Sequence, residues 1–218
     1  MNTAAYKPYS KGEEIMNSIS HGIGSLLSVI GGSVMVTLSA CFSNWRAVMS
    51  SSIYSFALVL MFTMSTLYHA IPFEKAKKVM RIMDHNCIYL LIAGTYTPIT
   101  IVLLMESGKG IFIFTSVWIL AVLGIILNAI SLNKFKHVSL VLYLLMGWAV
   151  VFDFKTVATL LGKTGLILLA AGGISYTVGV VFYKLKKIRY MHGVWHLFVL
   201  CGAVLHYFCV LSFILPAA

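Results

Sequence analysis

Charged residues are scarce in this chain. Only 10% of its 218 residues are Asp, Glu, Lys or Arg, and just six of them are acidic. A soluble domain usually carries about 25% charged residues. Hydrophobic residues make up 60% of the sequence instead, and the mean hydropathy is +0.95. This composition excludes a soluble globular domain and predicts an integral membrane protein.

Cysteine is also rare, and the sequence shows no repeats. The four cysteines, Cys41, Cys87, Cys201 and Cys209, have no C-x-x-C spacing, so no disulfide framework is expected. Neither an internal repeat nor an inverted symmetry is visible, and this disfavours a transporter built from repeats.

Apolar segments that can cross a bilayer recur along the sequence. About 20 apolar residues span the hydrocarbon layer as a helix. The predicted fold is an all-α integral membrane protein, in which residues 21–218 form a bundle of seven transmembrane helices after a polar segment, residues 1–20. The predicted spans are about 21–41, 46–70, 82–104, 111–131, 138–153, 164–183 and 193–215, of which the fifth is the shortest.

The formal net charge of +10 could indicate nucleic-acid binding. However, the basic residues form no single stripe with interleaved aromatics, so a nucleic-acid partner is rejected. Twelve of the sixteen Lys and Arg residues instead fall in alternate segments, near residues 7–11, 75–81, 134–136 and 184–189. Cytoplasmic loops carry such an excess, which predicts a cytoplasmic N-terminus and, with seven spans, a C-terminus outside.

Histidines mark the cytoplasmic ends of two predicted spans. His192 and His196 are four residues apart, so a helix presents both imidazoles on one face, where they can bind one metal ion. Alone the pair is a weak signal, because a histidine near the headgroups is commonly only interfacial. His69 ends the second span on the same side, and three imidazoles with an open fourth position form a catalytic zinc pattern. Copper, iron and nickel also accept imidazoles.

Two polar residues near these histidines are candidates for catalysis. Asp84 opens the predicted third span, where a carboxylate can hold and deprotonate a metal-bound water. A helix N-cap or a first-turn acid explains Asp84 equally well. Ser65 precedes His69 by about one helical turn and can orient a ligand or water, or simply bond to its own backbone.

Four further residues have less definite roles. Glu14 and His21 can brace the site or cap the first helix, and a structural role is favoured. His85 points about 100° away from Asp84 on an ideal helix, so the two are not expected to bind the same ion. His206 lies about 15 Å deeper along the helix axis than the histidine pair, where it can line a cavity.

Four motifs follow one another along nearly the whole chain. They are the entry segment 13–24, the S-T-L-Y-H run 65–69, the segment 84–98 that opens with Asp-His-Asn, and the H-G-V-W-H run 192–196. In this order the motifs resemble the bacterial hemolysin III family. That family is similar to the progestin and adipoQ receptors and, more distantly, to the alkaline ceramidases.

The resemblance implies a seven-helix bundle in the bacterial inner (plasma) membrane, with a zinc ion near the cytoplasmic face. His69, His192 and His196 would bind the zinc, Asp84 would contact it through water, and Ser65 would support the site. The receptors and ceramidases imply hydrolysis of a lipid amide. The bacterial branch carries a haemolytic label, and some members are linked to membrane homeostasis.

These observations support three hypotheses of function. The first is a zinc-dependent membrane hydrolase, ceramidase-like, that acts on a lipid amide or ester at headgroup depth. The second is a zinc-stabilised sensor or regulator of membrane homeostasis without catalysis, although a structural zinc usually has four protein ligands. The third is a cytolysin, which a chain without a soluble form disfavours. A proton relay or transporter is a minor alternative.

Overall fold

The computed structural model describes residues 9–185 and 187–217, and each regular element in this part of the chain is a helix. Residues 1–8 of the predicted N-terminal segment, Lys186 of the last basic loop and the terminal Ala218 lie outside the described residues. Five short elements connect or extend the long helices. They are the π-helices Ile99–Leu103 and Val210–Ile214 and the 3-10 turns Met105–Ser107, Ala149–Asp153 and Leu215–Ala217. The α-helices are α1 (Lys11–Phe42), α2 (Trp45–Ala70), α3 (Glu74–Pro98), α4 (Gly110–Gly147), α5 (Phe154–Lys184) and α6 (Met191–Cys209).

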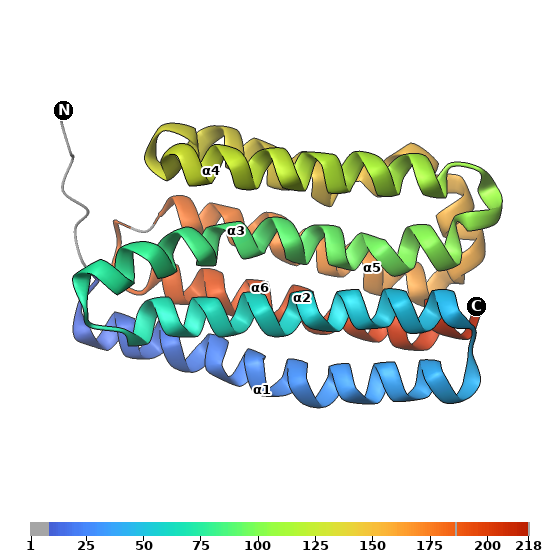
Figure 1. The fold of residues 1–218 in the computed structure, drawn as a ribbon, viewed down its shortest axis with the longest axis horizontal. Helices are drawn as coiled ribbons and strands as arrows, with labels where there is room; N and C mark the ends of the chain where they lie inside the picture. Colours follow the sequence, from blue (N-terminus) through green and yellow to red (C-terminus); the bar gives the residue numbers. More distant parts are fainter. Residues whose placement is uncertain (1–8, 186, 218) are drawn as a thin grey trace.

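Among the described residues, five helical stretches are long and apolar enough to cross a membrane. The fourth, Gly110–Lys184, has 75 residues. As one straight helix it would measure about 110 Å, whereas the hydrocarbon core is about 30 Å thick. Its backbone departs from helical geometry at Ser131 (φ −166°, ψ 97°) and at Gly162 (φ 62°, ψ −174°), and Figure 1 shows α4 turning back along the bundle. The prediction of a multi-pass, all-helical membrane protein is confirmed.

Side-chain caps set the starts of α1 and α2. The Ser10 hydroxyl accepts from the Glu13 backbone N–H at 3.4 Å, and the Glu13 carboxylate accepts from the Ser10 backbone N–H at 2.9 Å. This reciprocal capping box starts α1 at Lys11, so the entry segment and the first predicted span form one continuous helix. Asn44 caps α2 by accepting from two backbone N–H groups of its first turn.

The stretch formed by α3 and the following π-helix is the most buried of the five apolar stretches. It begins at Glu74, well before the predicted start near residue 82. Asp84 therefore lies about three turns inside α3, and its explanation as a helix cap is wrong. The α-helix ends at Pro98, which lacks an N–H donor, and a π-helical turn follows it.

Small residues bring α1 close to α2. A Cβ atom on Gly24 would lie only 2.5 Å from the ring of Phe62, which is itself 1% exposed. Outward-facing residues are instead large and apolar, such as Leu26 at 68% exposure and Ile130 at 69%. The bundle thus packs through close backbone approach inside and presents hydrocarbon side chains to the lipid.

Substituting Gly24 by alanine tests this close approach. Gly24→Ala is expected to destabilise the protein by about 1–3 kcal/mol, because the added methyl overlaps the Phe62 ring. The matched control is Gly22→Ala in the same helix, where the added Cβ would lie 3.7 Å from Thr66, an ordinary contact. Alanine is the better helix former, so this control is expected to be neutral or stabilising by up to about 1 kcal/mol. Thermal unfolding in detergent measures both; equal shifts would contradict the packing argument.

Candidate metal centre

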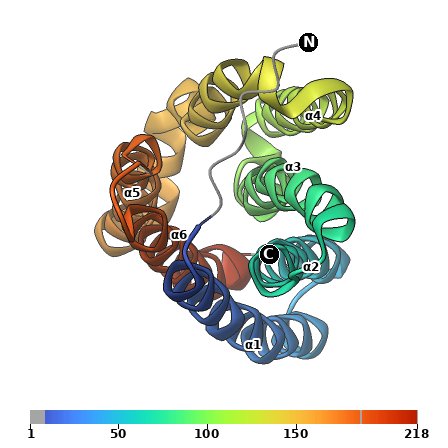
Figure 2. The same ribbon diagram turned by 90° about the vertical axis from the view of Figure 1, so that its left-hand side faces the viewer.

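Three imidazoles meet where α2 ends and α6 begins. His69 is the next-to-last residue of α2, and His192 and His196 lie in the first two turns of α6. One ring nitrogen of each histidine lies within 4.8 Å of the others, and all three side chains are buried. Figure 2 views the bundle from this end, with α6 beside α1. The fold therefore brings together the three histidines that the predicted topology placed at one depth.

The ring nitrogens in this cluster need a ligand. Among the described residues, Nε2 of His69, Nε2 of His196 and both nitrogens of His192 are buried without a hydrogen-bond partner. Each buried polar atom left unpaired costs about 1–3 kcal/mol. In its neutral form, an imidazole nitrogen without a proton offers a lone pair to a metal ion. The cluster therefore fits a divalent metal such as zinc, and copper, iron and nickel have the same preference for imidazole.

The carboxylate of Glu14, on α1, fixes the ring of His69. Its Oε2 accepts a hydrogen bond from His69 Nδ1 at 2.6 Å, and its Oε1 pairs with Lys77 Nζ at 2.7 Å. Because Nδ1 carries the proton, Nε2 keeps its lone pair for the cluster. A carboxylate bonded to the far nitrogen of a metal-binding histidine orients the ring and raises its basicity. Glu14, whose role the sequence left open, thus braces the candidate site.

Helix α1 also fixes the ring of His196. Its Nδ1 donates to the backbone carbonyl of Asn17 at 3.1 Å and lies 3.2 Å from the Ser20 hydroxyl. The ring of His21 stacks on that of His196, with 3.6 Å between centroids and 8° between planes. Two of the three imidazoles therefore receive their orientation from the first three turns of α1. Of the two roles that the sequence offered for His21, this contact fits bracing of the site.

The residues before α1 cover the remaining histidine. The ring of Tyr9 stacks on His192, with 4.9 Å between centroids and 24° between planes. The Glu13 carboxylate accepts from the backbone N–H of Tyr190 at 3.1 Å, just before α6 begins. Tyr190 has a positive φ of 64°, a conformation in which few non-glycine residues occur. The same carboxylate that caps α1 thus ties down the chain that enters α6.

Asp84 and Ser65, the predicted catalytic residues, lie beside the cluster. Asp84 is 3% exposed, and its Oδ2 lies 3.2 Å from Nδ1 of His85. Its carboxyl interacts with His69 and Ser65, but it is not one of the residues whose ligand atoms gather in the cluster. The buried Ser65 hydroxyl lies near this carboxyl, and no bond from it to its own backbone is observed in the described part of the chain. Their catalytic roles stay predictions.

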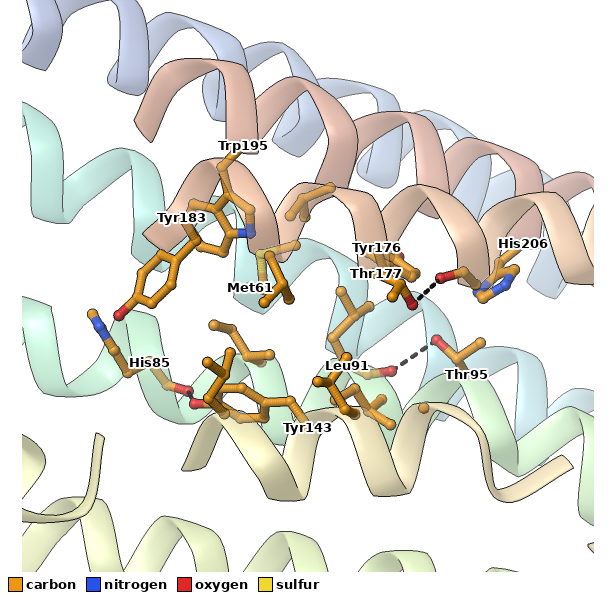
Figure 3. A pocket seen from close by; sticks show the side chains of 18 of the residues that line it. Met61, His85, Leu91, Thr95, Tyr143, Tyr176, Thr177, Tyr183, Trp195 and His206 are labelled. Atoms are coloured by element: carbon orange, nitrogen blue, oxygen red, sulfur yellow. Dashed lines mark hydrogen bonds between the residues drawn. The ribbon is translucent and has the colours of Figure 1, made fainter. Parts of the chain in front are cut away.

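An apolar pocket begins next to the cluster and runs along the interior of the bundle (Figure 3). At the cluster end its wall includes Asp84, His21 and Trp195, and farther along it includes Tyr176 and His206. His206 thus lines a cavity, as predicted. The other walls come from apolar side chains of α3, α4, α5 and α6. A mostly apolar pocket with a few polar groups is typical of a site for an apolar ligand.

Comparison with known proteins agrees with this architecture. Residues 9–207 match the family model described as haemolysin-III related. The chain is 38% identical over 206 residues to a protein named hemolysin-3 of Bacillus cereus, covering 94% of each chain. It is 40% identical over 204 residues to a hemolysin-3 homolog of Bacillus subtilis, covering 92% of this chain and 94% of the relative. The human monocyte to macrophage differentiation factor is 30% identical over 217 residues, or 96% of this chain and 87% of the relative.

Elemental analysis tests whether the cluster holds a metal. The purified protein is expected to contain a stoichiometric divalent metal, and the double variant His192→Ala/His196→Ala is expected to lose it, because two of the three gathered imidazoles are removed. The control variant His137→Ala changes an exposed histidine of α4 and should keep the metal. Equal metal content in the double variant would show that the ion binds elsewhere.

Removing the brace tests the role of Glu14. Glu14→Ala is expected to weaken metal binding about 10- to 100-fold, because the His69 ring loses its carboxylate partner. Competition with a chromophoric chelator measures the affinity. The control is Glu74→Ala, which removes an exposed carboxylate that pairs with Lys78 at 2.8 Å. An unchanged affinity in Glu14→Ala would mean that the His69 ring is held by its packing alone.

Proposed function

Since this chain belongs to the haemolysin-III related family, we propose that it is a zinc-dependent membrane hydrolase that cleaves a lipid amide or ester. The observation that carries the proposal is the apolar pocket that starts beside the histidine cluster. Asp84 belongs to the wall of this pocket and also interacts with His69. A hydrocarbon chain in the pocket would therefore bring its polar end to Asp84, beside the three imidazoles.

We also propose that the chain crosses the membrane seven times. The breaks at Ser131 and Gly162 divide the 75-residue stretch, and the chain reverses direction within it. Three crossings there and four in the other stretches give seven. The excess of basic residues at the cluster end favours a cytoplasmic N-terminus in a bacterial inner membrane.

The proposed reaction divides the work between the metal and the side chains. A zinc ion held by His69, His192 and His196 would supply an acidified water and polarise the scissile carbonyl. Asp84 accepts a proton at its carboxylate and returns it to the leaving group. The Ser65 hydroxyl, buried near that carboxylate, orients the groups that approach it. Glu14 holds the proton of the neutral His69 ring at Nδ1, so that Nε2 offers its lone pair, and the apolar walls exclude bulk water.

A turnover assay tests the hydrolase directly. Wild-type protein in lipid nanodiscs is expected to cleave long-chain acyl amides or the matching esters when zinc is present. His69→Ala is expected to reduce turnover to background, and Asp84→Asn to lower it on the order of 10²–10⁴-fold, as for the loss of a general base. Mass spectrometry of the released fatty acid measures both.

The exposed His137 supplies the control for this assay, because His137→Ala should keep full turnover. Equal turnover in wild type and His69→Ala would end the hydrolase proposal. A protein that holds stoichiometric zinc but cleaves none of these lipids would instead support the zinc-stabilised regulator.

Reporter fusions test the seven crossings. A periplasm-dependent alkaline phosphatase fused after Ala218 is expected to be active, and a green fluorescent protein at the same position dark, because an odd number of crossings puts the C-terminus outside. The reverse pattern would show an even number of crossings or the opposite orientation. Fusions at position 1 should give the opposite result and serve as the internal control.

A further inference from the structure

A second group of unpaired polar atoms lies deeper in the pocket. His206 is buried, and its Nε2–H donates to the backbone carbonyl of Leu169 at 3.1 Å. Its Nδ1 has no partner in the described part of the chain, nor has the hydroxyl of Tyr176. The two rings contact each other edge to face, with 5.4 Å between centroids. In the neutral imidazole Nδ1 is then an acceptor, while Tyr176 offers a donor.

Two glycines make room for this pair. A Cβ atom on Gly172 of α5 would collide with the imidazole of His206, and one on Gly202 of α6 would lie 3.0 Å from the ring of Tyr176. Each polar ring therefore lies against a glycine of the opposite helix. Both rings belong to the wall of the apolar pocket (Figure 3). Polar side chains this deep in a membrane protein are expensive and mark functional sites.

The depth of the pair is defined by its helix. His206 follows His196 by ten residues on α6, so it lies about 15 Å farther along the axis. This distance is about half the thickness of the hydrocarbon core, or the depth of one leaflet. A lipid whose scissile group lies at the histidine cluster would place the middle or the far part of its chain at His206. A plain hydrocarbon chain would leave both polar atoms unpaired.

We propose that the His206–Tyr176 pair binds a hydroxyl group carried in the middle of the substrate's hydrocarbon chain. A hydroxyl can donate to Nδ1 of His206 and accept from Tyr176, so it satisfies both unpaired atoms at once. The inference rests on the proposed function, because it requires an acyl chain in this pocket. It adds a substrate class, namely lipids with mid-chain hydroxylated acyl groups. A trapped water has the same hydrogen-bonding chemistry, and the test must separate the two.

Displacement of a fluorescent fatty acid from the protein in nanodiscs provides the test. The competitors are octadecanoic acid, 12-hydroxyoctadecanoic acid and 2-hydroxyoctadecanoic acid. The mid-chain hydroxy acid is expected to bind about five- to tenfold more tightly than the other two, the effect of one net hydrogen bond. Equal binding of all three would mean that water or nothing occupies the pair, and would overturn the inference.

Conservative variants separate recognition from folding. Tyr176→Phe removes only the hydroxyl and is expected to weaken the preference, because the chain hydroxyl then keeps Nδ1 of His206 alone. It should keep both the affinity for octadecanoic acid and the thermal midpoint, because the Tyr176 hydroxyl has no partner to lose among the described residues. Tyr207→Phe is the control, since the Tyr207 hydroxyl donates to the Gly31 carbonyl at 3.0 Å and its ring is not in the wall of the pocket. An undiminished preference in Tyr176→Phe would overturn the assignment.

The outcomes also distinguish this inference from the proposed function. If none of the acids displaces the probe, the pocket takes no acyl chain, and both the lipid substrate and the hydroxyl site are rejected. If all displace it equally, only the hydroxyl site is rejected. The assay measures binding and not turnover, so its result holds whether or not the protein hydrolyses amides.

Discussion

Imidazole nitrogens buried inside a helix bundle need partners, and this constraint organises one end of the molecule. A polar atom that is buried without a hydrogen-bond partner costs about 1–3 kcal/mol. Three histidines from the end of α2 and the start of α6 nonetheless bring one ring nitrogen each within 4.8 Å of one another, and four of their nitrogens lack a hydrogen-bond partner among the described residues. A metal ion held by all three rings would pair such nitrogens and join α2 to α6.

Helix α1 is the element that holds the cluster together. Within its first three turns Glu13 ties down the backbone before α6, Glu14 bonds to His69, and the Asn17 carbonyl bonds to His196. The capping box at Ser10 fixes where these turns begin. A helix with an exposed, lipid-facing outer surface thus positions residues that lie on two other helices. The first three turns of α1, which the sequence predicts only as an entry segment before the first span, thus hold the side chains of the site in position.

Local patterns in the sequence were enough to predict part of this site. The i, i+4 spacing places His192 and His196 on one face of any helix, and the charge bias puts His69 at the same end. Bracing by Glu14 was one of two alternatives, and the sequence could not decide between them because the contact with His69 depends on how α1 packs against α2. Asp84 was expected to open a helix, since hydropathy rises only after residue 82. In the fold, polar residues extend α3 back to Glu74.

The three histidines are not equivalent, and the difference bears on how the site can work. His69 is backed by a carboxylate and His196 by a backbone carbonyl, whereas neither nitrogen of His192 has a hydrogen-bond partner among the described residues. A metal-binding imidazole without such a partner is a weaker base and is held less firmly. The stacked ring of Tyr9 covers it instead. His192 is therefore positioned by ring packing, against Tyr9, Tyr183 and Trp195, whereas hydrogen bonds position the other two imidazoles.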